Sequence, residues 1–77
     1  MKITMESTTK LVTLNGLPAR LWEGTTETGI PVICFVTRVA VPEGRPAEDY
    51  VAFERQLQEQ KPPHPELAGA FDARLIL

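Results

Sequence analysis

Cysteine and histidine are almost absent from this chain, which holds one of each, Cys34 and His64, among 77 residues. A single cysteine excludes an internal disulfide, and one cysteine with one histidine cannot supply a closed zinc site. We therefore expect no metal. A chain this short builds a small core, which is commonly supplemented by a disulfide, a metal or another chain. With the first two excluded, association is the supplement that remains, although many chains of this size fold alone.

Clusters of like charge are also missing. Eight basic and ten acidic residues are spread along the chain and give a net charge of −2. Without a basic stripe, the composition disfavours binding to nucleic acid. No apolar stretch approaches the roughly 20 residues that span a bilayer, and Lys2 is followed by polar residues. We expect no membrane span, no signal peptide and a reduced cytoplasmic setting.

The chain contains no recognisable catalytic pattern. The position of Cys34 in an apolar strand predicts a buried, inert thiol. His64 stands among prolines, with no nucleophile that it could orient. The carboxylates are scattered, and the segment between Gly24 and Gly29 precedes a strand, whereas phosphate loops precede a helix. We therefore expect no catalytic residues, no cofactor and no enzymatic activity.

The longest apolar run covers residues 30–41 and reads I-P-V-I-C-F-V-T-R-V-A-V. Its β-branched and aromatic residues favour a strand, and they fall on both faces of that strand. Such strands are normally buried on both sides. Because 77 residues can hardly cover both faces of one sheet, this run predicts a partner surface.

Two turn signals precede this run. Asn15-Gly16 lies between apolar residues and predicts a tight hairpin that joins strands over 9–14 and 17–23. A polar loop from Gly24 to Gly29 predicts a wider hairpin into the long strand. We expect residues 1–8 to be a flexible N-terminus and residues 9–77 to form a single domain.

A single helix is expected after the third strand. Pro46 suits the first helical position, and Pro62-Pro63 indicates that the helix ends by residue 60. Tyr50, Phe53 and Leu57 form an apolar stripe along it. Residues 71–77 alternate as a strand. The whole predicts an α+β fold in the order β-β-β-α-β, with a mainly antiparallel sheet and the helix packed on one face.

The two turns sort the strand residues between faces. If the loops close at residues 15–16 and 24–29, Val12 opposes Ala19 and Leu21 opposes Val32, and opposed residues share a face. We expect the helix to cover the face with Val12, Leu14, Leu17, Ala19, Leu21, Val32, Cys34 and Val36. The outer face would carry Leu11, Thr13, Pro18, Arg20, Trp22, Pro31, Ile33, Phe35 and Thr37. A one-residue slip inverts this assignment.

An apolar outer face with a polar rim is typical of an interface. The predicted partner-binding residues are Leu11, Arg20, Trp22, Ile33, Phe35, Arg38 and Val39. We expect a small non-enzymatic accessory or regulatory protein whose partner is a second copy, as a homodimer, or a heterologous protein. One alternative is a single-stranded nucleic-acid-binding module that uses Arg20, Trp22 and Phe35. A second alternative is a small enzyme whose site is completed across a dimer interface. A third is that this sheet face is only a solvated surface with no partner.

Overall fold

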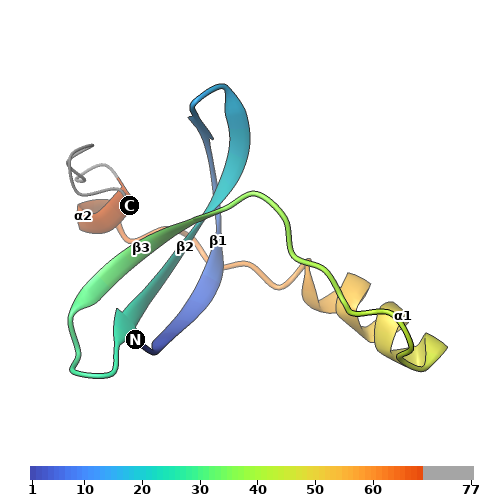
Figure 1. Ribbon diagram of the computed structural model, residues 1–77. Helices are drawn as coiled ribbons and strands as arrows, with labels where there is room; N and C mark the ends of the chain where they lie inside the picture. Colours follow the sequence, from blue (N-terminus) through green and yellow to red (C-terminus); the bar gives the residue numbers. More distant parts are fainter. Residues whose placement is uncertain (69–77) are drawn as a thin grey trace.

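The computed structural model describes residues 1–68, which contain a three-stranded antiparallel sheet and helices (Figure 1). Its elements are β1 (Ile3–Leu14), β2 (Leu17–Thr26), β3 (Pro31–Val36), α1 (Ala47–Gln56) and the four-residue α2 (Pro65–Ala68). The sheet order β1-β2-β3 and the helix confirm a small α+β domain. The strand expected over 71–77 lies outside the described residues. Within residues 1–68, no helix has the length and apolarity needed to cross a bilayer.

The first hairpin forms where Asn15-Gly16 predicts it. Both residues have positive φ, 52° and 80°, as a type I′ turn requires. Leu14 pairs with Leu17, so the predicted register of this hairpin is confirmed. However, β1 begins at Ile3, within the stretch expected to be flexible, and residues 3–7 pair with residues 22–26 of β2. The N-terminal residues are therefore part of the sheet.

The second hairpin closes three residues later than the sequence indicates. The Thr26 N–H donates to the Ile30 carbonyl at 2.9 Å, and the Gly29 N–H donates to the Thr26 carbonyl at 3.0 Å. Gly29 has a φ of 89°, which suits the last position of a three-residue loop. As a result, Leu21 pairs with Phe35 and not with Val32. The predicted register of this hairpin is wrong.

Gly24 explains the error, because it is a strand residue and not the start of the loop. A β-carbon at this position would collide with the carbonyl oxygen of Thr4 and the α-carbon of Met5 on β1. Glycine is therefore required here for the close approach of two strands. The loop contains only residues 27–29.

The true register divides the sheet into two faces, because opposed residues share a face and successive residues alternate. We call the first the Trp22 face; it carries Ile3, Met5, Ser7, Leu11, Arg20, Trp22, Val32, Cys34 and Val36. We call the second the Leu21 face; it carries Val12, Leu14, Leu17, Ala19, Leu21, Glu23, Ile33 and Phe35. Ile33 and Phe35 were expected beside Trp22 and instead lie on the opposite side of the sheet.

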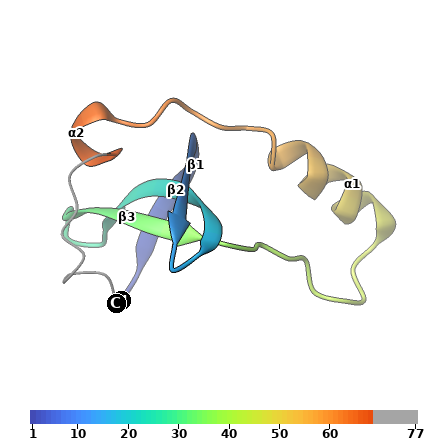
Figure 2. The same cartoon turned by 90° about the horizontal axis from the view of Figure 1, so that it is seen from above.

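The helix does not cover the Leu21 face. Residues 37–60, which we call the arm, leave the end of β3, extend to the side of the sheet and carry α1 there (Figures 1 and 2). Pro46 is the N-cap residue, and α1 ends at Gln56, four residues earlier than expected, with no buried residue. After the arm, residues 61–68 return to the sheet. Glu23 on the Leu21 face contacts this returning segment, so the segment occupies space that the helix was expected to fill.

The buried core is small. Among residues 1–66, Ala19 and Leu21 are the only buried apolar residues, and Thr8 and Glu23 are the buried polar ones. Thr8 donates its hydroxyl to the Leu21 carbonyl at 2.6 Å, where the β1–β2 register shifts. The centre of the sheet therefore combines two apolar side chains with two polar ones.

We expect Gly24→Ala to destabilise the fold by roughly 1–3 kcal/mol, because the new methyl group forces β1 away from β2. Gly29→Ala is the matched control; its methyl group meets open space, but the positive φ disfavours alanine by about 1 kcal/mol. Urea unfolding of both variants measures the difference. Equal losses would contradict the steric role of Gly24.

Candidate functional site

The most promising site is a groove of about 310 Å³ between the Trp22 face and the arm, which we call the arm groove. The sheet supplies Ser7, Arg20, Trp22 and Val36. The arm supplies Thr37, Arg38, Val39, Phe53, Gln56 and Leu57. Its walls therefore come from segments up to 50 residues apart in sequence, joined by the excursion of the arm. Such a groove can accept an apolar group and hold a charged one at its rim.

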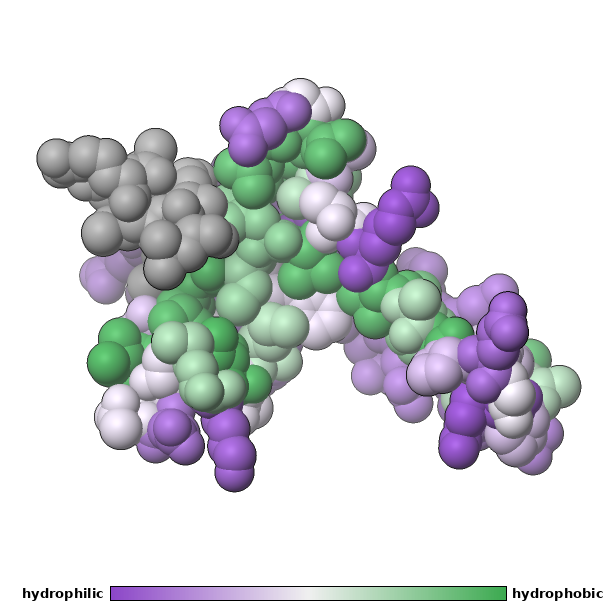
Figure 3. Space-filling model, viewed as in Figure 1, coloured by the Kyte–Doolittle hydropathy of each residue, from purple (hydrophilic) through white to green (hydrophobic). Residues whose placement is uncertain are grey.

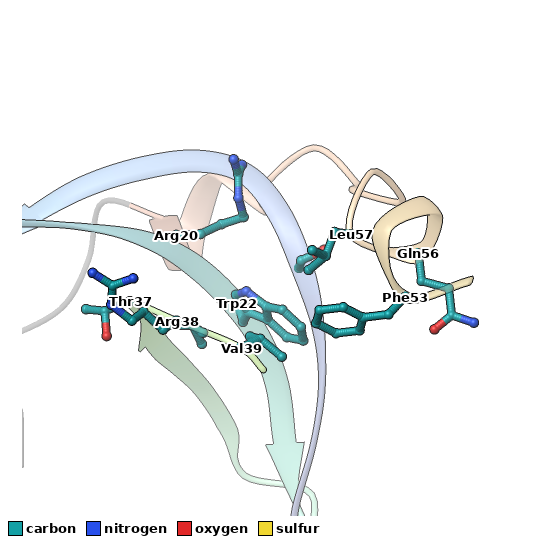
Figure 4. Close-up of a pocket in the computed structure, with 10 residues that line it drawn as sticks. Arg20, Trp22, Thr37, Arg38, Val39, Phe53, Gln56 and Leu57 are labelled. Atoms are coloured by element: carbon teal, nitrogen blue, oxygen red, sulfur yellow. The ribbon is translucent and has the colours of Figure 1, made fainter. Parts of the chain in front are cut away.

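Aromatic packing defines the floor of the groove. Phe53 points from α1 toward the indole of Trp22, and Val39 lies beside both rings (Figure 4). Leu57 comes one helical turn after Phe53 and faces the same side (Figure 4). The apolar stripe of the helix is thus real, but it meets the Trp22 face at its margin and not the Leu21 face.

Two arginines line the groove, and they differ in how firmly they are held. Arg20 donates from Nη1 to the Thr8 carbonyl at 3.0 Å and to Oε1 of Gln60 at 3.3 Å. These bonds fix Arg20 between β1 and the end of the arm. Arg38 is exposed and has no hydrogen bond or ion pair with any other residue of 1–68. Its guanidinium is available to a carboxylate from outside the chain.

A second polar centre fastens the returning segment to the sheet; we call Glu23, Lys61 and His64 the clamp. Glu23 is only 4% exposed. Its Oε2 accepts the His64 backbone N–H at 2.7 Å, and its Oε1 lies 3.0 Å from the Lys61 ammonium. Burial of the carboxylate raises its pKa, but the His64 N–H and the Lys61 charge lower the pKa by more, so it lies below the ordinary value of 4.5. Glu23 is therefore ionised at neutral pH.

Backbone hydrogen bonds reinforce the clamp along the free edge of β1. The Thr9 N–H donates to the Lys61 carbonyl at 2.9 Å, and the Lys61 N–H donates to the Ser7 carbonyl at 3.2 Å. The Ser7 hydroxyl donates to the Glu59 carbonyl at 3.0 Å. This short parallel bridge covers an edge that would otherwise be open to other strands.

The structure divides the predicted partner-binding residues between three places. Arg20, Trp22, Arg38 and Val39 come together in the arm groove. Leu11 lies on the Trp22 face near the hairpin tip and is 62% exposed. Ile33 and Phe35 belong to the Leu21 face, so they do not share a surface with the other five.

The clamp was not foreseen from the sequence, although a signal for it exists. Glu23 follows Ala19 and Leu21 at every second position of the same strand, so the three side chains lie on one face. This places a carboxylate on an apolar face. A buried carboxylate requires a cation or N–H donors. Lys61 and the residues that follow it could have been nominated on that basis.

Two side chains that could take part in acid–base chemistry, those of His64 and Tyr50, make local contacts. His64 accepts the Glu66 N–H at Nδ1 at 3.2 Å, and the Tyr50 hydroxyl donates to the Pro42 carbonyl at 3.0 Å. Cys34 is a half-buried free thiol on the Trp22 face. Within the described part of the chain, no three side chains of His, Cys, Asp or Glu are grouped to hold a metal ion.

We expect Phe53→Ala to shift the fluorescence emission of Trp22 to longer wavelength, because water replaces the ring against the indole. Trp22 is the only tryptophan, so the signal is unambiguous. Val51→Ala is the matched control, since Val51 is 68% exposed and lies on the far side of α1. A red shift in the control as large as in Phe53→Ala would contradict the packing of the arm groove.

We expect Glu23→Gln to lower the free energy of unfolding by about 1–2 kcal/mol at pH 7, through loss of charge-assisted bonds. Because folding lowers the pKa of Glu23, the wild-type advantage is present above pH 4.5 and is lost as the pH falls through the lowered value. Urea unfolding from pH 7 to pH 3 measures this. The exposed Glu27→Gln is the control; a Glu23→Gln deficit that persists unchanged at pH 3 would refute the assignment.

Comparison with known proteins identifies no relative of this chain. No protein family, no curated protein and no solved structure matches it. The function is therefore argued from the geometry of its surfaces.

Proposed function

We propose that this protein is a small non-enzymatic accessory or regulatory protein that acts through protein–protein association, and that it associates with a second copy of itself. The observation that carries the proposal is the imbalance between buried and exposed apolar residues. Ala19 and Leu21 are buried, whereas ten large apolar residues of the described chain are at least 38% exposed. A core of this size offers little to offset the conformational entropy of folding.

Surface area supports the same proposal. The chain exposes 6253 Å². A compact monomer of its mass, 8.5 kDa, exposes about 4,650 Å². The excess, roughly 1,600 Å², is about twice what one partner buries in a standard interface. The Cα radius of gyration is 14.0 Å, against about 11.5 Å for a compact chain of 77 residues.

The Trp22 face is the surface we assign to the interface. Its apolar members Ile3, Met5 and Leu11 are exposed, while Trp22 and Val36 are half-buried. The arm adds Val39 and Leu57 at one side, so sheet and arm together form an angled apolar surface. Figure 3 shows hydrophobic residues along both the sheet and the arm. Such a surface is typical of an interface core, with Trp22 and Arg20 as candidate hot spots.

A second copy accounts for this surface better than the alternatives. A heterologous protein could use the same residues, but nothing in the chain specifies its chemistry. A base-stacking platform for single-stranded nucleic acid is less well supported, because Phe35 lies on the opposite face from Arg20 and Trp22. An enzyme completed across a dimer would need His64 or Tyr50 near a carboxylate of the other chain. Both side chains instead bond to backbone groups of nearby residues in the same chain.

We expect the wild-type protein to be a dimer at micromolar concentration and Leu11→Glu to raise its dissociation constant at least about tenfold, by placing a charge in an apolar interface. Leu17→Glu is a matched control: Leu17 is 60% exposed, close to the 62% of Leu11, and lies on the Leu21 face of the same hairpin. Sedimentation equilibrium over a dilution series measures both variants.

Three results decide the matter. A monomeric wild type at every concentration would exclude self-association. A dimer that both variants weaken equally would show that the Trp22 face is not the specific interface. Weakening by Leu11→Glu alone supports the assignment.

A further inference from the structure

The arm is hydrogen-bonded to the sheet at one end only. Within the described chain, the hydrogen bonds and ion pairs of residues 37–58 stay inside the arm. The last two residues of the arm, which we call the anchor, reach the sheet. The Glu59 carbonyl accepts the Ser7 hydroxyl at 3.0 Å. Oε1 of Gln60 accepts a bond from Nη1 of Arg20 at 3.3 Å. Because α1 has no buried residue, the position of the arm depends largely on this anchor.

The end of α1 is joined to the anchor by an unbroken series of hydrogen bonds. The N–H groups of residues 57–59 donate back to carbonyls within residues 53–56. The side-chain amide of Gln60 donates to the Leu57 carbonyl at 3.1 Å. Phe53 and Leu57, which line the arm groove, are therefore held in a fixed relation to the anchor.

The anchor is continuous with the clamp on the other face of the sheet. Lys61 directly follows the anchor, and its ammonium lies 3.0 Å from Oε1 of Glu23. Ser7 and Arg20, to which the anchor is bonded, lie on the Trp22 face, whereas Glu23 lies on the Leu21 face. Residues 59–64 therefore cross the edge of β1 and connect the clamp with the arm groove.

Glu23 is the member of this connection whose charge can be removed. The charged groups that face it are Lys61 and His64 of the returning segment and Glu6, which opposes it on β1. The third strand, β3, contains no charged residue. When the Glu23 carboxylate is neutral, its ion pair with Lys61 is lost and its bond from the His64 N–H is weaker. The backbone bonds along the β1 edge do not depend on this charge.

We infer that the clamp positions the arm and thereby controls association through the Trp22 face. This inference rests on the proposed function, because the surface that it regulates is the proposed interface. With Glu23 ionised, the arm holds Phe53 and Leu57 at the margin of the Trp22 face, where the arm completes the angled apolar surface. When Glu23 loses its charge, residues 59–64 are held less firmly and the arm moves away from Trp22. The interface then loses one side, and the dimer is weaker.

Glu23→Gln tests the positioning of the arm, and the fluorescence of Trp22 reports it. The substitution preserves the shape of the side chain and removes its charge, and the Glu23 and Trp22 side chains lie on opposite faces. We expect the variant to shift the Trp22 emission to longer wavelength, by at least about half of the shift in Phe53→Ala. The double variant should shift by less than the sum of the two, because both changes disrupt the same contact.

Two controls separate positioning from a loss of charge or of stability. Glu6→Gln removes a charge from the same face, and Glu6 is exposed without a hydrogen bond or ion pair to any other residue of 1–68. Gly29→Ala lowers stability at the second hairpin and not at the arm. Circular dichroism shows that each variant is folded. An unshifted Glu23→Gln variant, or an equal shift in either control, would overturn the inference.

Sedimentation equilibrium measures the effect on association. We expect Glu23→Gln to raise the dimer dissociation constant at least about tenfold and Glu6→Gln to leave it within about threefold. A dimer that Glu23→Gln leaves intact overturns the control of association, while self-association itself stands. A monomeric wild type overturns the proposed function and the control of association with it, whereas the Trp22 emission still decides whether the clamp positions the arm.

Acid titration provides a second measurement of the same coupling. Because the pKa of Glu23 lies below 4.5, the wild-type emission should be constant near neutral pH and shift as the pH falls through the lowered value. Glu23→Gln should lack this transition, whereas Glu6→Gln should keep it. A transition of the same size in Glu23→Gln would come from another carboxylate and would overturn the assignment to Glu23.

Discussion

One hydrogen bond, from the Thr26 N–H to the Ile30 carbonyl, determines how the sheet presents its side chains. By closing the second hairpin around residues 27–29, it fixes which residues of β2 and β3 are opposed. Trp22 then shares a face with Cys34 and Val36, while Leu21 shares the other with Phe35. A different closure would have assembled different surfaces from the same strands, because each register shift by one residue inverts the faces.

This register gives the two faces different roles. The Leu21 face carries Glu23, and that buried carboxylate holds the segment that returns from the arm. The Trp22 face meets the arm only at the arm groove and leaves apolar residues in solvent. One face thus serves the integrity of the fold, and the other is the surface that we propose for association.

The sequence predicts the local features well and the long-range ones less well. Asn15-Gly16 specifies its own turn, because both positions need positive φ, and the first hairpin follows from it. The expected register of the second hairpin failed because Gly24 has two meanings in a sequence: it can open a loop, or it can let a neighbouring strand approach closely. The contact with Thr4 on β1 decides between them, and that contact is tertiary.

The candidate site was half predictable for the same reason. The composition of the sequence indicates four of the residues that line the arm groove: Arg20, Trp22, Arg38 and Val39. Phe53 and Leu57 were recognised as an apolar stripe, but the stripe alone does not say which face it meets. The clamp depends on Lys61 and His64, which lie about 40 residues from Glu23 in sequence, and no local pattern joins them.

The backbone bridge between Thr8 and Lys61 has a consequence for the order of folding. The two hairpins close over loops of two and three residues, whereas this bridge must close a loop of about 50, at a greater cost in chain entropy. During synthesis, the sheet residues are complete well before Lys61 emerges. Until then the Glu23 carboxylate lacks both the Lys61 ammonium and the His64 N–H, so this part of the Leu21 face is covered last.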